Sequence, residues 1–453
     1  MVHRFVMNGV RVVLDVFSGA VHVVDEPAWT LIGLLERGGT VEEAVTQAVA
    51  DGASEQAVRE AAAAIGEVVR AGRLLTADPC DPDYILPRRP LRALCLHLAH
   101  DCNLRCAYCF AGQGPYRGSR SLMSAAVGRR ALDYLLEHSG SYHRVEVDFF
   151  GGEPLMNFPV LRELVRYGRV QEKRTGKRIN FTVTTNGVLL SDEVAAFLDQ
   201  EGFQVILSLD GRPAVHDTMR RTRRGEGSYA LVAPRIKRFV EGRNNWNCYV
   251  RGTYTRFNTD FSADFIHLVR LGFRNISLEP VVAAPDQPYA LREEDYPVLA
   301  AEYERLAVWL ASEQNPGVRF FHFDLHLEDG PCLAKRLSGC GAGNEYLAVD
   351  PDGNLFPCHQ FVGRAAFRMG NIWERKVRED LVDVFRRSHS LAKEECRKCW
   401  ARFFCGGGCH AGALDVTGDM RRPGRLYCLL LRKRVECGLY LAARSRNAFA
   451  AAG

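Results

Sequence analysis

The stretch Asp101-Cys102-Asn103-Leu104-Arg105-Cys106-Ala107-Tyr108-Cys109-Phe110 decides the fold of this chain. Its three cysteines are separated by three and by two residues. A loop this short cannot close a cage of four thiolates, but it can hold three corners of a 4Fe–4S cube, because thiolates are the usual ligands of such clusters. One iron then stays free for a substrate or cofactor. Half of a zinc site and a trio left from a disulfide set are the alternative interpretations.

The length and composition of the chain limit the classes of protein to which it can belong. The 453 residues predict two or three domains, and a hydrophobic content of 47% supplies an ordinary core. A net charge of +5 is small for this length and favours neither a nucleic-acid partner nor a disordered tail. The first nine residues lack the apolar core of a secretory signal, and no apolar run reaches the roughly 18 residues of a membrane span. We therefore expect a cytoplasmic protein with no membrane partner.

Fifteen cysteines are many for a protein of the reducing cytoplasm, where disulfides are rare. Their odd number also argues against complete pairing, so metal or cluster ligation is the better default. Nine of the fifteen lie after position 331.

Residues 1–76 are predicted to form a small separate domain. Arg11–Phe17 and Ala20–Val24 flank a Ser-Gly turn and indicate a hairpin. Three helices should follow, with the capping residues Asp25, Thr40 and Ser54. A hairpin with three helices looks like a winged helix, a fold that can bind DNA. The third helix is acidic and Ala-rich, however, and offers no dense basic face.

Residues 77–90 are a linker rich in Pro and Asp. Strands and helices then alternate through residues 91–281. The predicted strands are Leu91–Leu98, Val145–Phe150, Ile179–Thr185, Phe203–Leu209, Asn247–Thr255 and Asn275–Glu279, and the helices lie near 124–138, 159–175, 191–201, 228–241 and 260–271. This alternation predicts an α/β fold with a parallel sheet, a partial (β/α)6 barrel. Chemistry in parallel barrels gathers at the carboxyl ends of the strands, where the cysteine loop falls.

Residues 282–331 form a connection with one helix near Tyr296–Ser312, and residues 332–453 are rich in Cys and Gly. Long periodic apolar runs are scarce in 332–437, so this part should need ligated clusters as crosslinks. The Ala-rich end after Leu441 predicts a helix that frays.

Three further motifs follow strands. Gly151-Gly152-Glu153-Pro154 follows the second strand, and its glycines permit a close backbone approach while Glu153 places a carboxylate at the barrel mouth. Asn186-Gly187 ends the third strand, and Ser208-Leu209-Asp210-Gly211, with Arg220 downstream, ends the fourth. Each of these alone predicts only a turn or a solvated loop.

The second cysteine array is more specific. Cys340 precedes Gly353 by twelve intervening residues, and Cys358 follows after four more. The array continues as Cys396-x2-Cys399-x5-Cys405-x3-Cys409 and ends at Cys428. The alternative interpretation is structural zinc, with Cys396, Cys399, Cys405 and Cys409 as one tetrahedral cage.

Together these motifs resemble those of the radical S-adenosylmethionine (SAM) enzymes that carry a SPASM extension. The resemblance implies that Cys102, Cys106 and Cys109 hold the radical-generating cluster. It also implies SAM contacts from Tyr108, Gly151, Gly152, Glu153, Asn186, Ser208 and Arg220. Two auxiliary 4Fe–4S clusters are implied, one on Cys396, Cys399, Cys405 and Cys428, the other on Cys340, Cys358 and Cys409. Cys332 or a substrate thiolate would complete the latter.

Within these peptide maturases, the run Val12–Asp25 and the runs 340–349 and 357–361 resemble the SCIFF maturases. That resemblance implies thioether crosslinks, from Cys sulfur to carbon, in a Cys-rich ribosomal peptide. The peptide's leader would bind as an extra strand at the hairpin of the N-terminal domain. The radical chemistry also implies a reducing electron donor. The alternatives are a formylglycine-forming enzyme like the anaerobic sulfatase maturases, and a zinc-dependent winged-helix regulator.

Overall fold

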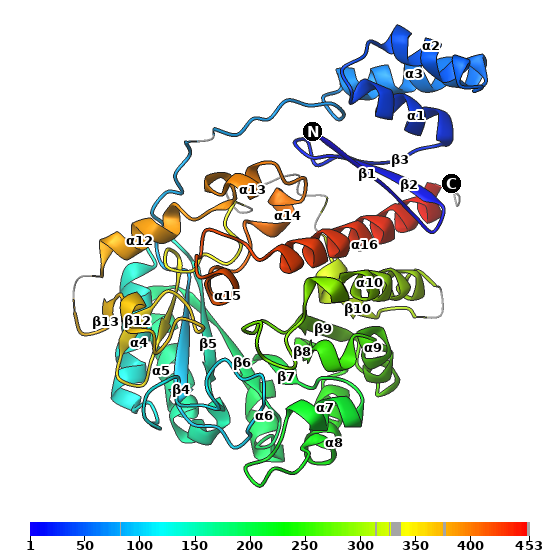
Figure 1. Ribbon diagram of the computed structural model, residues 1–453. Coiled ribbons are helices and arrows are strands. Elements are labelled where there is room, and N and C mark those ends of the chain that lie inside the picture. The colour runs from blue at the N-terminus through cyan, green and yellow to red at the C-terminus, as the bar shows by residue number, and fades with distance from the viewer. Residues whose placement is uncertain (82, 313–314, 326, 328–336, 375–376, 451–453) are drawn as a thin grey trace.

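The computed structural model describes residues 1–81, 83–312, 315–325, 327, 337–374 and 377–450. Its secondary structure begins with a three-stranded antiparallel sheet and three helices (Figure 1). These elements are β1 (Val2–Met7), β2 (Val10–Asp15), β3 (Val21–Val23), α1 (Glu26–Leu35), α2 (Val41–Ala50) and α3 (Glu55–Arg70). The predicted hairpin and the caps Asp25, Thr40 and Ser54 are confirmed. Strand β1 is an addition, and the winged-helix assignment is not confirmed.

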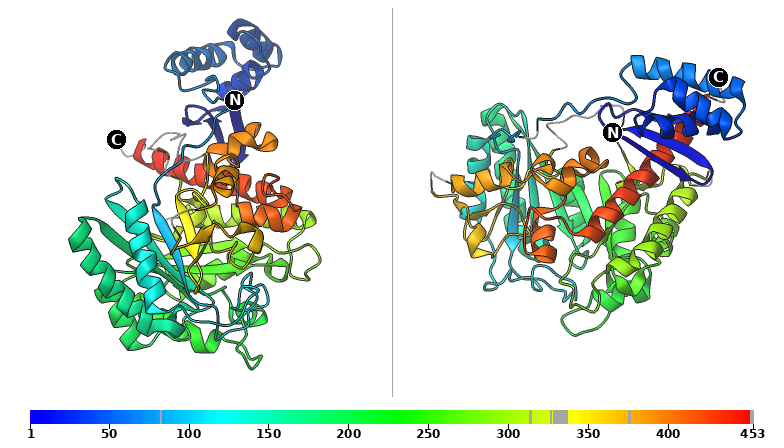
Figure 2. Two further views of the ribbon diagram at one scale, coloured as in Figure 1. Left: turned by 90° about the vertical axis from the view of Figure 1, so that its left-hand side faces the viewer. Right: turned by 45° about the horizontal axis from the view of Figure 1, so that its top comes forward.

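The N-terminal sheet is covered on both faces. Val13 of β2 packs in a cluster with residues of α1, α2 and α3. Its neighbours Val12 and Leu14 point to the other face and join the main core. Helix α16 (Arg425–Ala450) contacts β2 and β3 and runs below the sheet (Figures 1 and 2). The sheet is therefore packed directly against the carboxyl-terminal helix.

The main sheet has ten strands among the described residues, in the order β10-β9-β8-β7-β6-β5-β4-β11-β12-β13. All neighbours from β10 to β11 are parallel, whereas β12 and β13 are antiparallel. The bounds are β4 (Ala93–Ala99), β5 (Arg144–Gly151), β6 (Arg178–Thr185), β7 (Gln204–Ser208), β8 (Cys248–Tyr254), β9 (Asn275–Pro280), β10 (Arg319–Phe320), β11 (Tyr346–Val349), β12 (Asn354–Phe356) and β13 (Gly370–Asn371). The six strands predicted for the barrel are confirmed as β4 to β9.

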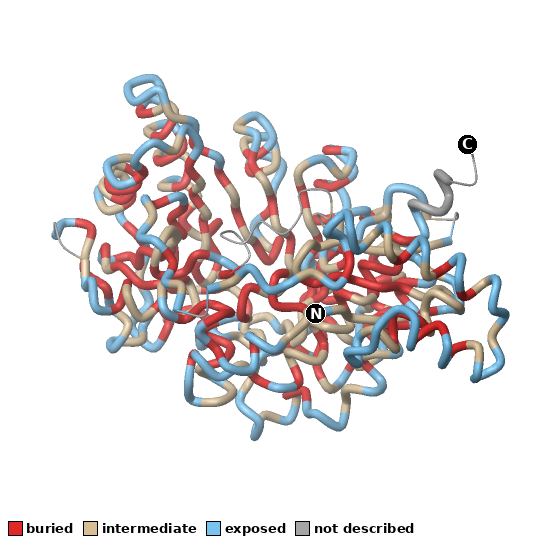
Figure 3. Tube along the Cα trace, turned by 90° about the horizontal axis from the view of Figure 1, so that it is seen from above, coloured by how far each residue is buried: buried red, intermediate tan, exposed pale blue. Residues whose placement is uncertain are grey.

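Helices cover one face of this sheet, as expected for right-handed crossovers between parallel strands. They are α4 (Ala125–His138), α5 (Phe158–Thr175), α6 (Asp192–Gln200), α7 (Pro213–Met219), α8 (Tyr229–Gly242), α9 (Phe261–Arg270) and α10 (Tyr296–Leu310). Residues of β5 to β8 alternate between buried and partly or fully exposed positions. The face turned away from the helices therefore stays accessible, while the buried residues gather inside the fold (Figure 3).

The carboxyl-terminal part consists of short elements. They are α12 (Glu379–Arg386), α13 (Glu394–Arg397), α14 (Arg402–Cys405) and α15 (His410–Thr417), which precede the long α16. Six single-turn helices complete the described residues: η1 (Pro154–Asn157), η2 (Arg256–Asn258), η3 (Glu293–Asp295), η4 (Phe321–Phe323), η5 (Ala365–Phe367) and η6 (Ser390–Ala392). The helix expected after Leu441 is the end of α16, which begins much earlier. In the described part of the chain, no helix combines the length and apolarity that crossing a membrane requires.

Candidate active site

The cysteine loop follows β4 and is fixed by the segment after α7. The amide of Arg105 donates to the carbonyl of Arg221 at 2.6 Å, and that of Ala107 donates to the carbonyl of Met219 at 2.8 Å. The guanidinium of Arg223 donates to the carbonyl of Cys102 at 2.7 Å and pairs with Asp101. These contacts fix the shape of the loop.

The structure brings the three thiols of this loop together. Burial first, then the carboxylate of Glu153 and the neighbouring Cys106 and Cys109, raises the pKa of Cys102 to about 12. Burial also raises the pKa of Cys106 to about 11, against the opposing effect of Arg220. Three converging thiols on a loop held by these contacts fit the corner positions of an iron–sulfur cluster.

The two glycines of the motif after β5 serve the protein's own backbone. A Cβ at Gly152 would lie 2.2 Å from the carbonyl oxygen of Asp101, and one at Gly151 would lie 2.4 Å from that of Ala99. The amide of Glu153 donates to the Asp101 carbonyl at 2.9 Å. Gly152 thus approaches the start of the cysteine loop and Gly151 approaches the end of β4, while the close approach to a ligand stays a prediction.

Glu153 and Asn186 tie the ends of β5 and β6 to that loop. The Glu153 side chain is 1% exposed and accepts hydrogen bonds from the amides of Leu155 and Asn186 and from the Thr185 hydroxyl. Burial raises its pKa to about 7. The Asn186 amide group donates to Asn103 at 2.8 Å and lies 3.6 Å from the sulfur of Cys102. Both predicted residues thus lie within one or two contacts of the first cysteine.

Asp210 is a site residue that sequence reasoning missed. It is 1% exposed and accepts from the Tyr108 hydroxyl at 2.5 Å, from the Arg220 guanidinium at 3.1 Å and from the Thr253 amide at 3.0 Å. Arg220 also lies 5.4 Å above the Tyr108 ring and interacts with the Cys106 thiol. The sequence did offer one signal, an acidic residue directly after an apolar strand. A carboxylate buried at such a place needs a cationic partner. The predicted Ser208 is the half-buried last residue of β7, two positions before Asp210.

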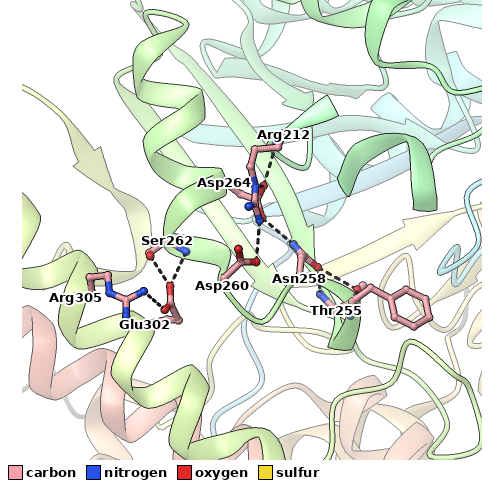
Figure 4. A network of polar contacts seen from close by, with 9 residues as sticks. Arg212, Thr255, Asn258, Asp260, Ser262, Asp264, Glu302 and Arg305 are labelled. Atoms are coloured by element: carbon pink, nitrogen blue, oxygen red, sulfur yellow. Dashed lines mark hydrogen bonds and ion pairs between the residues drawn. The ribbon is translucent and has the colours of Figure 1, made fainter. Parts of the chain in front are cut away.

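A polar network holds the loop that carries Asp210 (Figure 4). The fully buried Asp264 of α9 accepts from the backbone and side chain of Arg212 at 3.0 and 2.7 Å. Asn258 donates to the same carboxylate and accepts from the amide of Thr255. This network fixes the turn after β7, and with it the Asp210 carboxylate.

The second array forms two groups of thiols. Burial, and then the neighbouring Cys340 and Cys409, raises the pKa of Cys358 to about 12. Burial, followed by Cys428, Cys396 and Cys399, raises the pKa of Cys405 to about 12. The structure thus brings together the two predicted ligand sets, whereas Cys332 lies outside the described residues. All fourteen described cysteines are free thiols.

Two basic residues near the four-thiol group were not predicted. Lys393 is 2% exposed, donates to the Gly407 carbonyl at 2.7 Å and interacts with Cys396, Cys405 and Cys428. Arg432 of α16 contacts Cys399. Cations beside thiolates offset the negative charge that a bound cluster and its ligands would carry.

The described residues include no three His, Cys, Asp or Glu side chains close enough together to bind a single metal ion.

The two cysteine regions meet at aromatic side chains. Phe110, next to Cys109, lies 5.7 Å from the ring of His359, next to Cys358. Phe150 of β5 lies 4.9 Å from the same imidazole. Phe110 is 49% exposed. The three-thiol loop and the Cys358 group thus face each other at the accessible side of the sheet.

Two family models match the chain. Residues 91–232 match a 4Fe–4S single cluster domain, and residues 340–400 match the SPASM iron–sulfur cluster-binding domain. Among curated proteins, the serine-type anaerobic sulfatase-maturating enzyme of Klebsiella aerogenes is 25% identical and covers 78% of this chain and 86% of its own length. The cysteine-type enzyme of Clostridium perfringens is 28% identical and covers 75% of this chain and 94% of its own length.

Solved structures share the fold. The native anSMEcpe structure with bound AdoMet superposes with a TM-score of 0.66 at 22% identity, covering 78% of this chain and 99% of its own. Streptococcus suis SuiB bound to the precursor peptide SuiA gives a TM-score of 0.54 at 15% identity, covering 94% of this chain and 98% of its own.

With these matches, the parallel barrel and the thiol groups define an iron–sulfur protein. More narrowly, the chain is an enzyme with a SPASM region that is similar to the anaerobic sulfatase-maturating enzymes. Its cofactors include 4Fe–4S clusters, whereas SAM and the ligand of each iron stay predictions. The zinc-dependent regulator finds no support.

Proposed function

We propose that this enzyme forms intramolecular thioether crosslinks, from Cys sulfur to carbon, in a Cys-rich ribosomally synthesised peptide. The observation that carries the proposal is the N-terminal sheet with its three helices, joined to the SAM barrel and the cysteine array. Such a unit gives a precursor peptide a binding surface that is separate from the cysteine loop where the reaction would occur.

The extent of the structural matches supports this choice. The sulfatase-maturating structure is matched over 99% of its length, yet covers only 78% of this chain. The SuiB–SuiA structure covers 94%, which leaves about 27 of the 453 residues unmatched. That remainder is smaller than the N-terminal unit, so most of the unit has a counterpart in an enzyme that binds a precursor peptide.

The chain's own residues have distinct roles in this proposal. When bound at Cys102, Cys106 and Cys109, the cluster and SAM would supply, with one electron from the donor, a 5′-deoxyadenosyl radical that takes a hydrogen atom from a peptide carbon. The Cys thiol would lose its proton as the C–S bond forms, and the surplus electron would pass to an auxiliary cluster. Tyr108, Asp210 and Arg220 form the wall beside Cys106, and Glu153 with Asn186 fixes the loop at Cys102. The accessible face of β5 to β8 receives the core of the peptide, next to Phe110 and His359. The Cys340, Cys358 and Cys409 group lies at the far side of these rings.

The leader would add to the edge strand β3, where main-chain hydrogen bonds supply the affinity. Val23 of this strand is 42% exposed, so an apolar leader residue has a surface to cover.

The test uses anaerobically reconstituted enzyme, SAM, a reductant and the short Cys-rich peptide encoded nearest to this gene. Each thioether removes two hydrogens from the peptide and keeps its sulfur. We expect this mass change together with 5′-deoxyadenosine, and fragment ions should place the link between a Cys and a carbon. SAM cleavage with an unchanged peptide mass would contradict the proposal.

The second candidate is formylglycine formation, which the curated relatives favour by their activity. Mass analysis separates the two reactions, because conversion of Cys to formylglycine removes the sulfur. A sulfatase-derived Cys peptide is the matched control, and we expect it to leave the reaction unmodified.

A further inference from the structure

Strand β1 of the N-terminal unit touches the segment that carries the four-thiol group. The ring of His3 stacks on the indole of Trp400, with centroids 3.6 Å apart and planes within 4°. Trp400 directly follows Cys399 in the chain. The Nε2 atom of His3 lies 3.0 Å from a carboxylate oxygen of Glu436 in α16. One side chain of the sheet therefore contacts both the cysteine segment and the helix.

A second contact lies at Arg402, between Cys399 and Cys405. Its guanidinium lies 5.0 Å above the ring of Phe17, just beyond the end of β2. It pairs with Asp78 of the linker at 2.6 Å and donates to the Arg397 carbonyl at 2.6 Å. The Arg402 side chain is 2% exposed. An arginine so deeply buried is costly to move, because its charge must keep these partners.

Helix α16 joins the same two regions by another route. Cys428 lies near its start, and Glu436 lies about two turns farther along. Glu436 also pairs with Lys433 at 2.6 Å, and Lys433 pairs with Glu304 of α10 at 2.8 Å. A continuous helix transmits position along its axis, so the place of Cys428 and the place of the sheet are set together.

We propose that the N-terminal sheet and the Cys396, Cys399, Cys405 and Cys428 site form one coupled unit, with His3 as its positioning residue. Ligation of these thiols by an iron–sulfur cluster then stabilises β1 and β2. Because coupling free energies are reciprocal, a peptide bound at the sheet also strengthens cluster retention at that site. This inference rests on the proposed function, since it takes the four thiols as cluster ligands and the sheet as the peptide site.

Other contacts besides the stacking of His3 on Trp400 also join the N-terminal sheet to the rest of the molecule. Asn8 donates to the Tyr440 hydroxyl at 3.2 Å, and the apolar face of β2 packs on α16. These contacts hold the sheet to α16, which also carries Cys428, but they involve neither Trp400 nor Arg402. If the coupling runs through His3 and Phe17, binding of a cluster at the four-thiol site should slow backbone hydrogen exchange chiefly in β1 and β2.

The test compares backbone hydrogen exchange in the apo protein and in the anaerobically reconstituted protein. A background with Cys102→Ala, Cys106→Ala and Cys109→Ala leaves iron only at the downstream sites. Iron, sulfide and EPR spectra establish loading independently of activity. We expect loading to slow exchange in residues 2–16 by about tenfold, a change typical of a local opening that becomes about 1.4 kcal/mol harder.

Three variants locate the coupling. His3→Ala should remove most of the slowing, and His3→Phe, which keeps a ring against Trp400, should retain part of it. The matched control is Arg4→Ala, on the same strand but directed to the other face, where it pairs with Glu36 and covers Trp29. This control should keep the full slowing.

The outcomes separate the two proposals. If the background protein takes up no downstream cluster, the ligand assignment fails, and the coupling fails with it. If the four-thiol site loads but exchange in β1 and β2 is unchanged, only the coupling is overturned. Equal effects of His3→Ala and Arg4→Ala would also overturn the role of His3. The wild-type comparison stands by itself if a variant does not fold.

Discussion

The charge of Asp210 holds together the group of side chains beside Cys106. Asp210 is the buried partner of Arg220, which is itself only 11% exposed in its side chain. Asp210→Asn keeps the shape but leaves a buried guanidinium unpaired, which should cost about 4 kcal/mol of unfolding free energy. Tyr108→Phe removes one hydrogen bond to a charged group and should cost about 2 kcal/mol. Urea unfolding of the barrel transition measures both, and equal costs would contradict the assigned ion pair.

Glu153 should make stability depend on pH. Burial raises its pKa from 4.5 to about 7 in the folded state, so the folded protein binds its proton more tightly than the unfolded chain. Its contribution is complete below pH 4.5 and is lost as pH rises toward 7 and above. The difference amounts to about 3 kcal/mol.

The measurement compares wild type with Glu153→Gln, both without SAM, from pH 4.5 to pH 8. The wild type should lose about 3 kcal/mol relative to the variant over this range. Parallel curves for the two proteins would show that Glu153 does not titrate as its burial requires.

Individual residues were predictable where their spacing resembles a known motif. The intervals between the cysteines singled them out, but they also allowed a zinc cage of Cys396, Cys399, Cys405 and Cys409, so the two ligand sets came from the resemblance to the SPASM enzymes. Asp210 and Lys393 could not be recognised as site residues, because their role depends on partners brought from other elements. For Asp210 these partners are Tyr108 and Arg220, each more than nine residues away in the chain.

At the scale of elements, the junction of β5 with the cysteine loop is the most sensitive point. A Cβ at Gly152 would meet the backbone of Asp101 at 2.2 Å, and a backbone contact cannot be relieved by rotating a side chain. Gly152→Ala should therefore cost about 3 kcal/mol and lower iron uptake by the upstream loop.

The control for this prediction is Gly242→Ala at the end of α8, where a Cβ would meet nothing within 4 Å. This change should be neutral or slightly stabilising, because alanine favours helices more than glycine does. Iron per protein and the midpoint of urea unfolding measure both variants, and normal iron uptake by Gly152→Ala would contradict the close contact.

The elements of the barrel could be predicted because buried parallel strands and amphipathic helices alternate with clear periodicity. Strands β4 to β9 lie within a few residues of their predicted positions. Strand β11 was not predicted, because four residues carry little pattern, and its place beside β4 is decided by tertiary pairing. Strand β1 was missed for a similar reason: its residues Val2–Met7 mix basic and apolar side chains.

At the scale of the whole molecule, the sequence predicted three parts but not how they pack. The carboxyl-terminal region extends the barrel sheet through β11, and α16 returns to cover the N-terminal sheet (Figures 1 and 2). Neither arrangement has a local signal, since each depends on contacts between residues hundreds of positions apart. The expectation that this region relies on ligation stays a prediction, since residues such as Leu355, Phe403 and Leu430 are buried in the main hydrophobic core.

The thiol groups together predict a pH dependence of cluster retention. The pKa of Cys102, Cys358 and Cys405 is raised to about 12, first by burial in each case. These thiols are protonated in the apo protein at neutral pH, so each ligand must release a proton when iron binds. The retention constant should therefore rise about tenfold per pH unit for each thiolate ligand. Consequently, the four-thiol site should lose its cluster more steeply with falling pH than a site with three protein thiolates.

Anaerobic titration from pH 8.5 to pH 6 in the presence of a chelator, followed by EPR and iron analysis, measures the two slopes. Cys428→Ala removes one ligand and should lower the slope of its site by one proton, whereas a slope unchanged by this variant would contradict ligation through Cys428.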